Sequence, residues 1–194
     1  MVKAIDVARY LLYLAACEPE PEPLTPLRLQ KLLYYAQGWS MGLRARPLFT
    51  EAIEAWDHGP VVREVYREFA DHQDQPIGAD GEADSVSLPQ GDKDFIRSIW
   101  DHYKQYSAGK LRAMTHEEAP WRSARGESRP GERCRNEIAH ADLLRHFEDE
   151  FRRQSAQGLS LERVRTAERE LESVDSKPLE YLADRIQHAF SGGH

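Results

Sequence analysis

Apolar residues recur at helical spacing through the N-terminal part of the chain. Between Val2 and Ala16 they fall at positions 5, 8, 12 and 15, which predicts an amphipathic helix. Residues 17–23 then place three prolines among glutamates, and prolines cannot continue a helix. Thr25 and Pro26 form a typical helix start, and a wide apolar stripe follows them over 27–42. We expect this second helix to be the central helix of the core.

Aromatic and polar residues border the stripe of this second helix. Tyr34 and Tyr35 flank the stripe. Lys31 lies off it, where its ammonium group would serve the surface or a buried ion pair. The stripe itself comprises Leu29, Leu32, Leu33, Ala36 and Trp39.

The helical period disappears after residue 44. A rough alternation of aromatic and β-branched residues up to Trp56 predicts one or two short strands, a small β element near 46–57. Gly59 and Pro60 predict a sharp turn followed by a new helix that begins at Pro60. The buried face expected for that helix is Val61, Val62, Val65, Tyr66 and Phe69.

Helical periodicity returns in the second half of the chain. It predicts a helix over 95–103, a short helix capped by Ser107, and a helix over 143–151 capped by Asn136 or His140. Ile138 is a candidate for a short extended pairing. The last forty residues show a thinner apolar stripe among many charges. The predicted fold is therefore mainly α: a compact helical domain with a small β element, plus a C-terminal helical extension.

Length and charge limit the class of protein. The chain has 194 residues, and 26 basic against 33 acidic side chains give a formal net charge of −7. That length suits one domain, or one domain with an appended element. The acidic balance argues against non-specific nucleic-acid binding, which needs a basic surface. Two cysteines are too few for a disulfide framework, and charges interrupt every apolar stretch, so we expect a cytoplasmic protein.

The charge is unevenly distributed. Residues 71–94 hold seven acidic residues against one lysine, and we expect an exposed loop there with a short edge strand at 85–88. Residues 122–135 hold five arginines against two glutamates, a local charge of +3. An acidic average therefore conceals two segments of opposite charge, and a partner can recognise either.

Motifs of known enzyme classes are missing from the sequence. There is no G-x-x-x-x-G-K-[ST] phosphate loop and no G-x-S-x-G nucleophile elbow. The segment beginning at His116 starts like a zinc-protease helix, but Pro120 stands where the second histidine ligand is needed. Asp57 and His58 are either half of an acid–base pair or caps of the helix expected from Pro60. We expect no catalytic residues, no cofactor and no metal site.

Three segments of unusual composition follow one another in the chain: 24–39 (LTPLRLQKLLYYAQGW), 47–66 with the run AWDHGPV, and 111–121 with its Thr-His and Pro-Trp pairs. Together they resemble the SocA-like antitoxin domain, or Panacea domain, of bacterial and phage toxin–antitoxin operons. The resemblance runs from about residue 2 to 151. It implies a non-enzymatic antitoxin that neutralises a cognate toxin, encoded in the same operon, by direct binding. For some relatives it also implies delivery of the toxin to an ATP-dependent protease.

The same resemblance divides the residues into scaffold and contact candidates. We expect an antitoxin domain over 1–153 and a helical extension over 154–194. A common domain that meets different toxins must take its specificity from variable surfaces, so we expect the extension to supply much of the toxin contact. The residues interpreted as structural are Lys31, Tyr34, Tyr35, Trp39, Trp56, His58, Gly59, Pro60, His116 and Trp121. The candidate toxin contacts are Arg122, Arg125, Arg129, Leu161, Val164, Leu171, Leu179, Leu182 and Ile186.

Two other functions stay open at this point. One is a DNA-binding operon regulator, against which the net charge of −7 and the lack of a basic recognition helix both count. The other is a hydrolase that uses His58 and His116 with a nearby carboxylate. Nothing in the sequence points to a membrane partner.

Overall fold

The computed structural model describes residues 2–19, 24–78 and 88–154. Over these residues the fold is mainly α-helical with one two-stranded antiparallel sheet, which confirms the predicted fold class. Within the described part of the chain, no helix has the length and apolar character needed to cross a membrane. The elements are α1 (Ala4–Ala16), α2 (Pro26–Arg44), β1 (Ile53–Trp56), β2 (Gly59–Val62), α3 (Arg63–Glu68), the 3-10 helix η1 (Ala70–His72), α4 (Gln90–Tyr103), α5 (Ala108–Glu117), α6 (Ala119–Arg125) and α7 (His140–Gln154).

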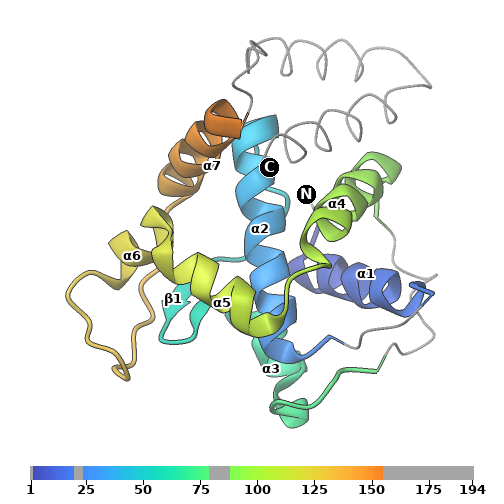
Figure 1. The fold of residues 1–194 in the computed structure, drawn as a ribbon, viewed down its shortest axis with the longest axis horizontal. Coiled ribbons are helices and arrows are strands. Elements are labelled where there is room, and N and C mark those ends of the chain that lie inside the picture. The colour runs from blue at the N-terminus through green and yellow to red at the C-terminus, as the bar shows by residue number, and fades with distance from the viewer. Residues whose placement is uncertain (1, 20–23, 79–87, 155–194) are drawn as a thin grey trace.

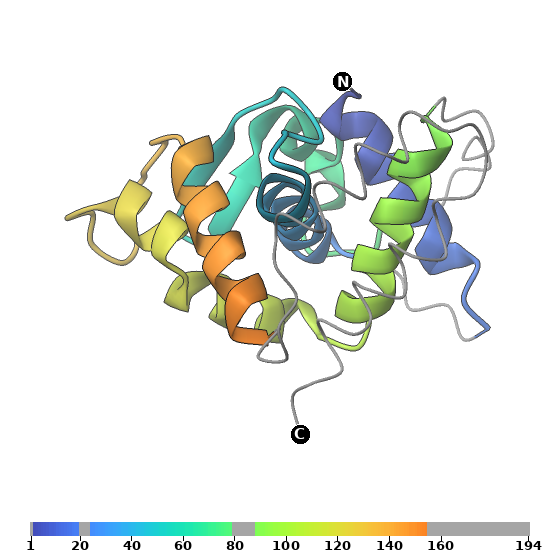
Figure 2. The same cartoon turned by 90° about the horizontal axis from the view of Figure 1, so that it is seen from above.

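Helix α2 is the axis of the fold. Figures 1 and 2 show α1, α4, α5, α7 and the β hairpin arranged around it. Of its 19 residues, 17 are buried, including both tyrosines that were expected only to flank the apolar stripe. The helix begins as predicted, with the Thr25 hydroxyl accepting a hydrogen bond from the Arg28 amide and Pro26 in the first turn. A helix buried on every side must satisfy its polar residues inside the protein.

Two glutamines on α2 form such hydrogen bonds, and through them they hold backbone segments that follow the helix in the chain. Gln37 accepts hydrogen bonds from the amides of Leu48 and Phe49 and donates one to the Phe49 carbonyl. Gln30 lies seven residues earlier on the same face, accepts from the Val62 amide at 2.7 Å, and donates to the Val62 carbonyl. Each amide side chain therefore pairs with the backbone as a neighbouring strand would.

The expected helix start at Pro60 is wrong. Residues Gly59–Val62 form β2, which pairs with β1 in the register Ile53↔Val62, and the helix begins only at Arg63. The proline is compatible with this strand because β2 lies at the edge of the sheet. The helix register also shifts as a result: Val65 is buried, but Tyr66, predicted to be buried, is 40% exposed.

Two glycines allow α2 and α7 to pack closely. A Cβ atom on Gly38 would lie 2.0 Å from Cε2 of Phe147, and one on Gly42 would lie 2.7 Å from the Cβ of Phe147. Phe147 is 1% exposed and contacts Tyr34 and Trp39 edge to face. Helix α7 is thus part of the core built on α2.

A carboxylate joins three helices at the same place. Glu118, just before α6, accepts hydrogen bonds from the hydroxyls of Tyr34 (2.6 Å) and Tyr35 (2.8 Å). Nε2 of His146, on α7, lies 3.5 Å from Oε2 of Glu118, the oxygen that accepts from Tyr34. Burial, and then the Glu118 charge, raise the pKa of both tyrosines, which keeps their hydroxyls protonated as donors.

Of the other predictions about helix caps and strands, some are confirmed, some are wrong and some fall outside the described residues. Ser107 caps α5 through the Lys110 amide, and Ile138 donates to the Ile53 carbonyl at 2.8 Å, so both predictions are confirmed. The predicted caps of α7 are wrong. His140 is already helical, and the side-chain amide of Asn136 donates to the Ala124 carbonyl. The expected strand at 85–88 lies almost entirely, and the C-terminal extension after residue 154 entirely, outside the described residues.

Candidate functional site

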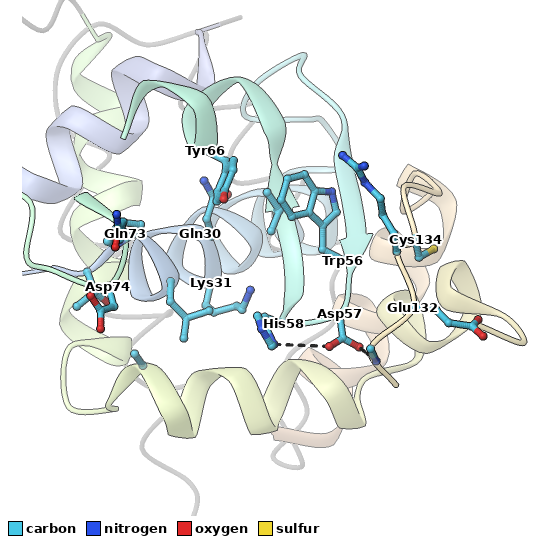
Figure 3. A pocket seen from close by; sticks show the side chains of 17 residues that line it. Gln30, Lys31, Trp56, Asp57, His58, Tyr66, Gln73, Asp74, Glu132 and Cys134 are labelled. Atoms are coloured by element: carbon cyan, nitrogen blue, oxygen red, sulfur yellow. Dashed lines mark hydrogen bonds and ion pairs between the residues drawn. The ribbon is translucent and has the colours of Figure 1, made fainter. Parts of the chain in front are cut away.

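A hollow of about 630 Å³ opens beside the β hairpin. We call it the hairpin hollow and define it by the lining segments 25–31, 56–61 and 131–134, together with single residues from α3, the 73–74 segment and α5. Figure 3 shows Trp56 and Tyr66 on one side of it and the Lys31 side chain reaching across toward the hairpin turn. The ring centroids of Trp56 and Tyr66 are 4.8 Å apart in an edge-to-face arrangement. The wall is therefore largely aromatic and apolar.

The floor of the hollow is made by α2 side chains that cover the free edge of β2. Lys31, completely buried, donates from Nζ to the Pro60 carbonyl at 2.9 Å, and Gln30 occupies the Val62 amide and carbonyl. The expectation of a surface position or a buried ion pair for Lys31 is wrong, since the side chain is buried and its ammonium group donates to a backbone carbonyl. Burial, and then the nearby Arg112 charge, lower the pKa of Lys31 to about 7.

Gly59 lets the hairpin approach this lysine. Its φ of +100° lies in a region that side chains disfavour, which confirms the conformational role expected for it. A Cβ atom there would lie 2.7 Å from Cε of Lys31 and 3.0 Å from Oγ1 of Thr115. The glycine is therefore required twice, by its backbone conformation and by the space around it.

Asp57 and Arg125 fasten the loop that forms the far wall. An Asp57 oxygen accepts from the Gly131 amide at 2.8 Å and pairs with Arg125 at 3.3 Å. The Gly131 hydrogen bond, together with the Arg125 charge, lowers the pKa of Asp57 against the opposing effect of burial. Arg125 also donates to the carbonyls of Arg129 and Glu132. Asp57 thus holds a loop and does not cap the helix that was expected at Pro60.

His116 and Trp121 lie on the other side of Asp57. Their rings stack 4.1 Å apart at 6°, and Trp121 donates to the Trp56 carbonyl at the end of β1, so the expected packing near the hairpin turn is confirmed. Burial, and then Arg112, lower the pKa of His116. His58, by contrast, is 69% exposed with Nδ1 3.8 Å from Asp57. Among the described residues no group of three histidine, cysteine, aspartate or glutamate side chains is placed to hold a metal ion.

The candidate toxin contacts fall in different places. Arg122 and Arg129 are exposed, and Arg122 lines a second hollow of about 710 Å³ beyond Asp57. Arg125 is only 5% exposed and its guanidinium is used inside the loop, so it is not available at the surface as predicted. The six apolar candidates of the C-terminal extension lie outside the described residues.

Sequence reasoning missed the polar residues that organise the site. Gln30 and Gln37 carry a weak signal, since they are polar residues seven positions apart beside the apolar stripe of one helix. Glu118 carries no such signal, because the two tyrosines that donate to it are more than eighty positions away. Trp39, read as a stripe residue, is 1% exposed and donates to the Tyr103 hydroxyl.

Lys31 gives the protein a pH dependence of known sign. Between its folded pKa of about 7 and its ordinary value of 10.5, the unfolded chain binds the proton more tightly than the folded one. Stability rises with pH wherever the unfolded state holds more protons. We expect the free energy of unfolding of the wild type, relative to Lys31→Met, to rise from about pH 6 to about pH 9 in urea titrations. Lys110→Met, at an exposed lysine, is the control; equal behaviour of the two variants would contradict the assignment.

Comparisons with known proteins place the same segments in one family. Residues 29–122 match the family described as "Antitoxin SocA-like, Panacea domain". Among curated proteins, Antitoxin SocA of Caulobacter vibrioides (strain NA1000 / CB15N) is 48% identical over 48 residues, which are 25% of this chain and 26% of that protein. No solved structure matches the chain. Over residues 29–122 the chain therefore matches the Panacea domain of SocA-like antitoxins, and its similarity to Antitoxin SocA supports the same family.

Proposed function

We propose that this protein is an antitoxin that neutralises a cognate toxin by direct protein–protein binding. The observation that carries the proposal is the match of residues 29–122 to the SocA-like antitoxin family. The similarity to Antitoxin SocA supports it, although the match spans only about a quarter of that relative. Delivery of the bound toxin to an ATP-dependent protease is a second part of the proposal, taken from the family alone.

The geometry favours binding over the hydrolase alternative. His58 is largely exposed, and its Asp57 neighbour is already used by Gly131 and Arg125. The Nε2 atom of His116 is buried without a hydrogen-bond partner among the described residues, and its ring lies flat against Trp121. A general base needs a proton within hydrogen-bond reach and a group that orients it. His116 therefore fits a packing role beside the hairpin turn, whereas His58 is an exposed residue of that turn.

The test is co-expression with the protein encoded by the neighbouring gene. That protein alone is expected to stop growth of the host, and growth is expected to recover when this chain is expressed with it. A chain ending at Gln154 tests the extension in the same assay: we expect it to stay folded and to lose much of the protection. The proposed function is wrong if the full chain gives no protection against a toxic neighbour.

A further inference from the structure

The hairpin hollow combines an apolar interior with carboxylates at its ends. Trp56, Tyr66, Val61 and Leu27 supply apolar lining, and Tyr66 is 40% exposed although it is a large aromatic residue. In Figure 3, Asp74 and Glu132 lie at opposite ends of the hollow. A volume of about 630 Å³ falls within the roughly 300–1,000 Å³ of typical ligand pockets. Exposed apolar concavities of this kind are typical of interaction sites.

Strand addition is excluded as the way a partner binds here. On its outer edge, β2 has its Val62 amide and carbonyl occupied by Gln30 and its Pro60 carbonyl occupied by Lys31, and Pro60 has no amide proton. The outer edge of β1 is covered by residues 136–138, through the Ala55 amide and the Ile53 carbonyl. A partner must therefore enter the hollow with its side chains, as an anchor does in helix-in-groove recognition.

The charged residues around the hollow indicate which side chains a partner segment would carry. Three carboxylates line it: Asp57, Asp74 and Glu132, of which Asp74 and Glu132 are exposed. Arg133 is the exposed arginine among the lining residues. Asp57 faces Arg125 and is compensated, whereas the Asp74 carboxylate accepts a hydrogen bond from the neutral side-chain amide of Gln75. The exposed carboxylates of Asp74 and Glu132 therefore favour a partner segment that carries basic side chains at the ends of the hollow.

From this arrangement we infer that the hairpin hollow binds a segment of the cognate toxin that inserts an apolar or aromatic side chain between Trp56 and Tyr66 and carries lysine or arginine beside it. The inference rests on the proposed function and locates part of the toxin contact at the hairpin hollow. The hollow is built from segments 25–31 and 56–61, which lie in the N-terminal domain. The inference therefore assigns part of the toxin contact to this domain, and not to the C-terminal extension alone. Aromatic residues in such pockets are frequent binding hot spots.

The experiment measures binding of the purified full chain to the protein encoded by the neighbouring gene. Tyr66→Glu is expected to weaken binding about 30-fold or more, the loss typical of an anchor site. Asp74→Lys is expected to weaken it about 3- to 10-fold at low salt, with the difference shrinking near 0.5 M salt. Tyr106→Ala and Asp149→Lys are matched controls that line neither hollow, and each is expected to change binding less than about 2-fold.

Each outcome has a defined meaning. If both hollow variants bind as the controls do, the inference is overturned while binding by the wild type preserves the proposed function. A small molecule that co-purifies in the hollow, with toxin binding unchanged by the variants, overturns it as well. If the wild type neither binds nor neutralises the neighbouring protein, the proposed function fails and this inference with it. Should Tyr66→Glu fail to fold, Asp74→Lys and photo-cross-linking from position 58, an exposed rim residue, decide the matter.

Discussion

Replacing Gly38 with alanine is expected to lower the free energy of unfolding by about 2–3 kcal/mol, although alanine is the better helix former. The added methyl group would lie 2.0 Å from the Phe147 ring. That ring is 1% exposed and is held by Tyr34 and Trp39, so it cannot move aside without disturbing the centre of the core. Urea denaturation of the purified variant measures the loss.

Gly109→Ala is the matched control for this prediction. Gly109 lies in α5 with open space where its Cβ would be, so alanine there is expected to raise stability by up to about 1 kcal/mol. Phe147→Leu introduced together with Gly38→Ala is expected to recover part of the loss, since it removes Cε2 and Cζ, the two ring atoms nearest to the added methyl group. The close packing of α2 on α7 is refuted if the two glycine variants shift stability equally.

Removing the Glu118 carboxylate gives the second large effect. Glu118→Ala leaves the hydroxyls of Tyr34 and Tyr35, which are 0% and 1% exposed, without their acceptor. Each unsatisfied buried hydroxyl costs about 1–3 kcal/mol, so we expect a total loss of about 2–6 kcal/mol. Glu118→Gln keeps the shape and one carbonyl acceptor and is expected to lose less than half as much. The measurement is again the free energy of unfolding in urea.

A variant in which the two tyrosines are replaced by phenylalanine provides the control for Glu118. In that background the hydroxyls are gone, and Glu118→Ala is expected to cost clearly less than it does in the wild type. An equal loss in both backgrounds would mean that Glu118 acts through something other than these two hydrogen bonds.

The features predictable from the sequence are those whose causes are local. Thr25 with Pro26, and Ser107, start helices through bonds to residues three positions away, so the chain shows both partners together. The same local reasoning failed at Gly59 and Pro60, since a glycine followed by proline fits an edge strand as well as a helix start. Pairing with β1 decides between the two, and Tyr66, expected on the buried face of that helix, is exposed and lines the hollow.

The candidate site depends on contacts that no local pattern shows. Lys31 meets the Pro60 carbonyl across 29 positions, Gln30 meets Val62 across 32, and Asp57 meets Gly131 across 74. A lysine beside an apolar stripe normally indicates a surface position, because burying its charge is costly. Here the buried amine is held by a carbonyl and its pKa falls, which only the folded arrangement reveals. The resemblance to the antitoxin family pointed to the right segments without giving their geometry.

The central claim is that the chain neutralises a toxin by binding it, and a titration tests that claim most directly. Purified chain is added in steps to a fixed amount of the protein encoded by the neighbouring gene, and the remaining toxic activity is measured. A binding antitoxin is expected to remove activity linearly with an end point at a fixed molar ratio, followed by a stable complex on size exclusion. Loss of activity at far smaller amounts of the chain, with no complex formed, would show catalysis and contradict this account; no loss of activity at any amount would contradict it as well.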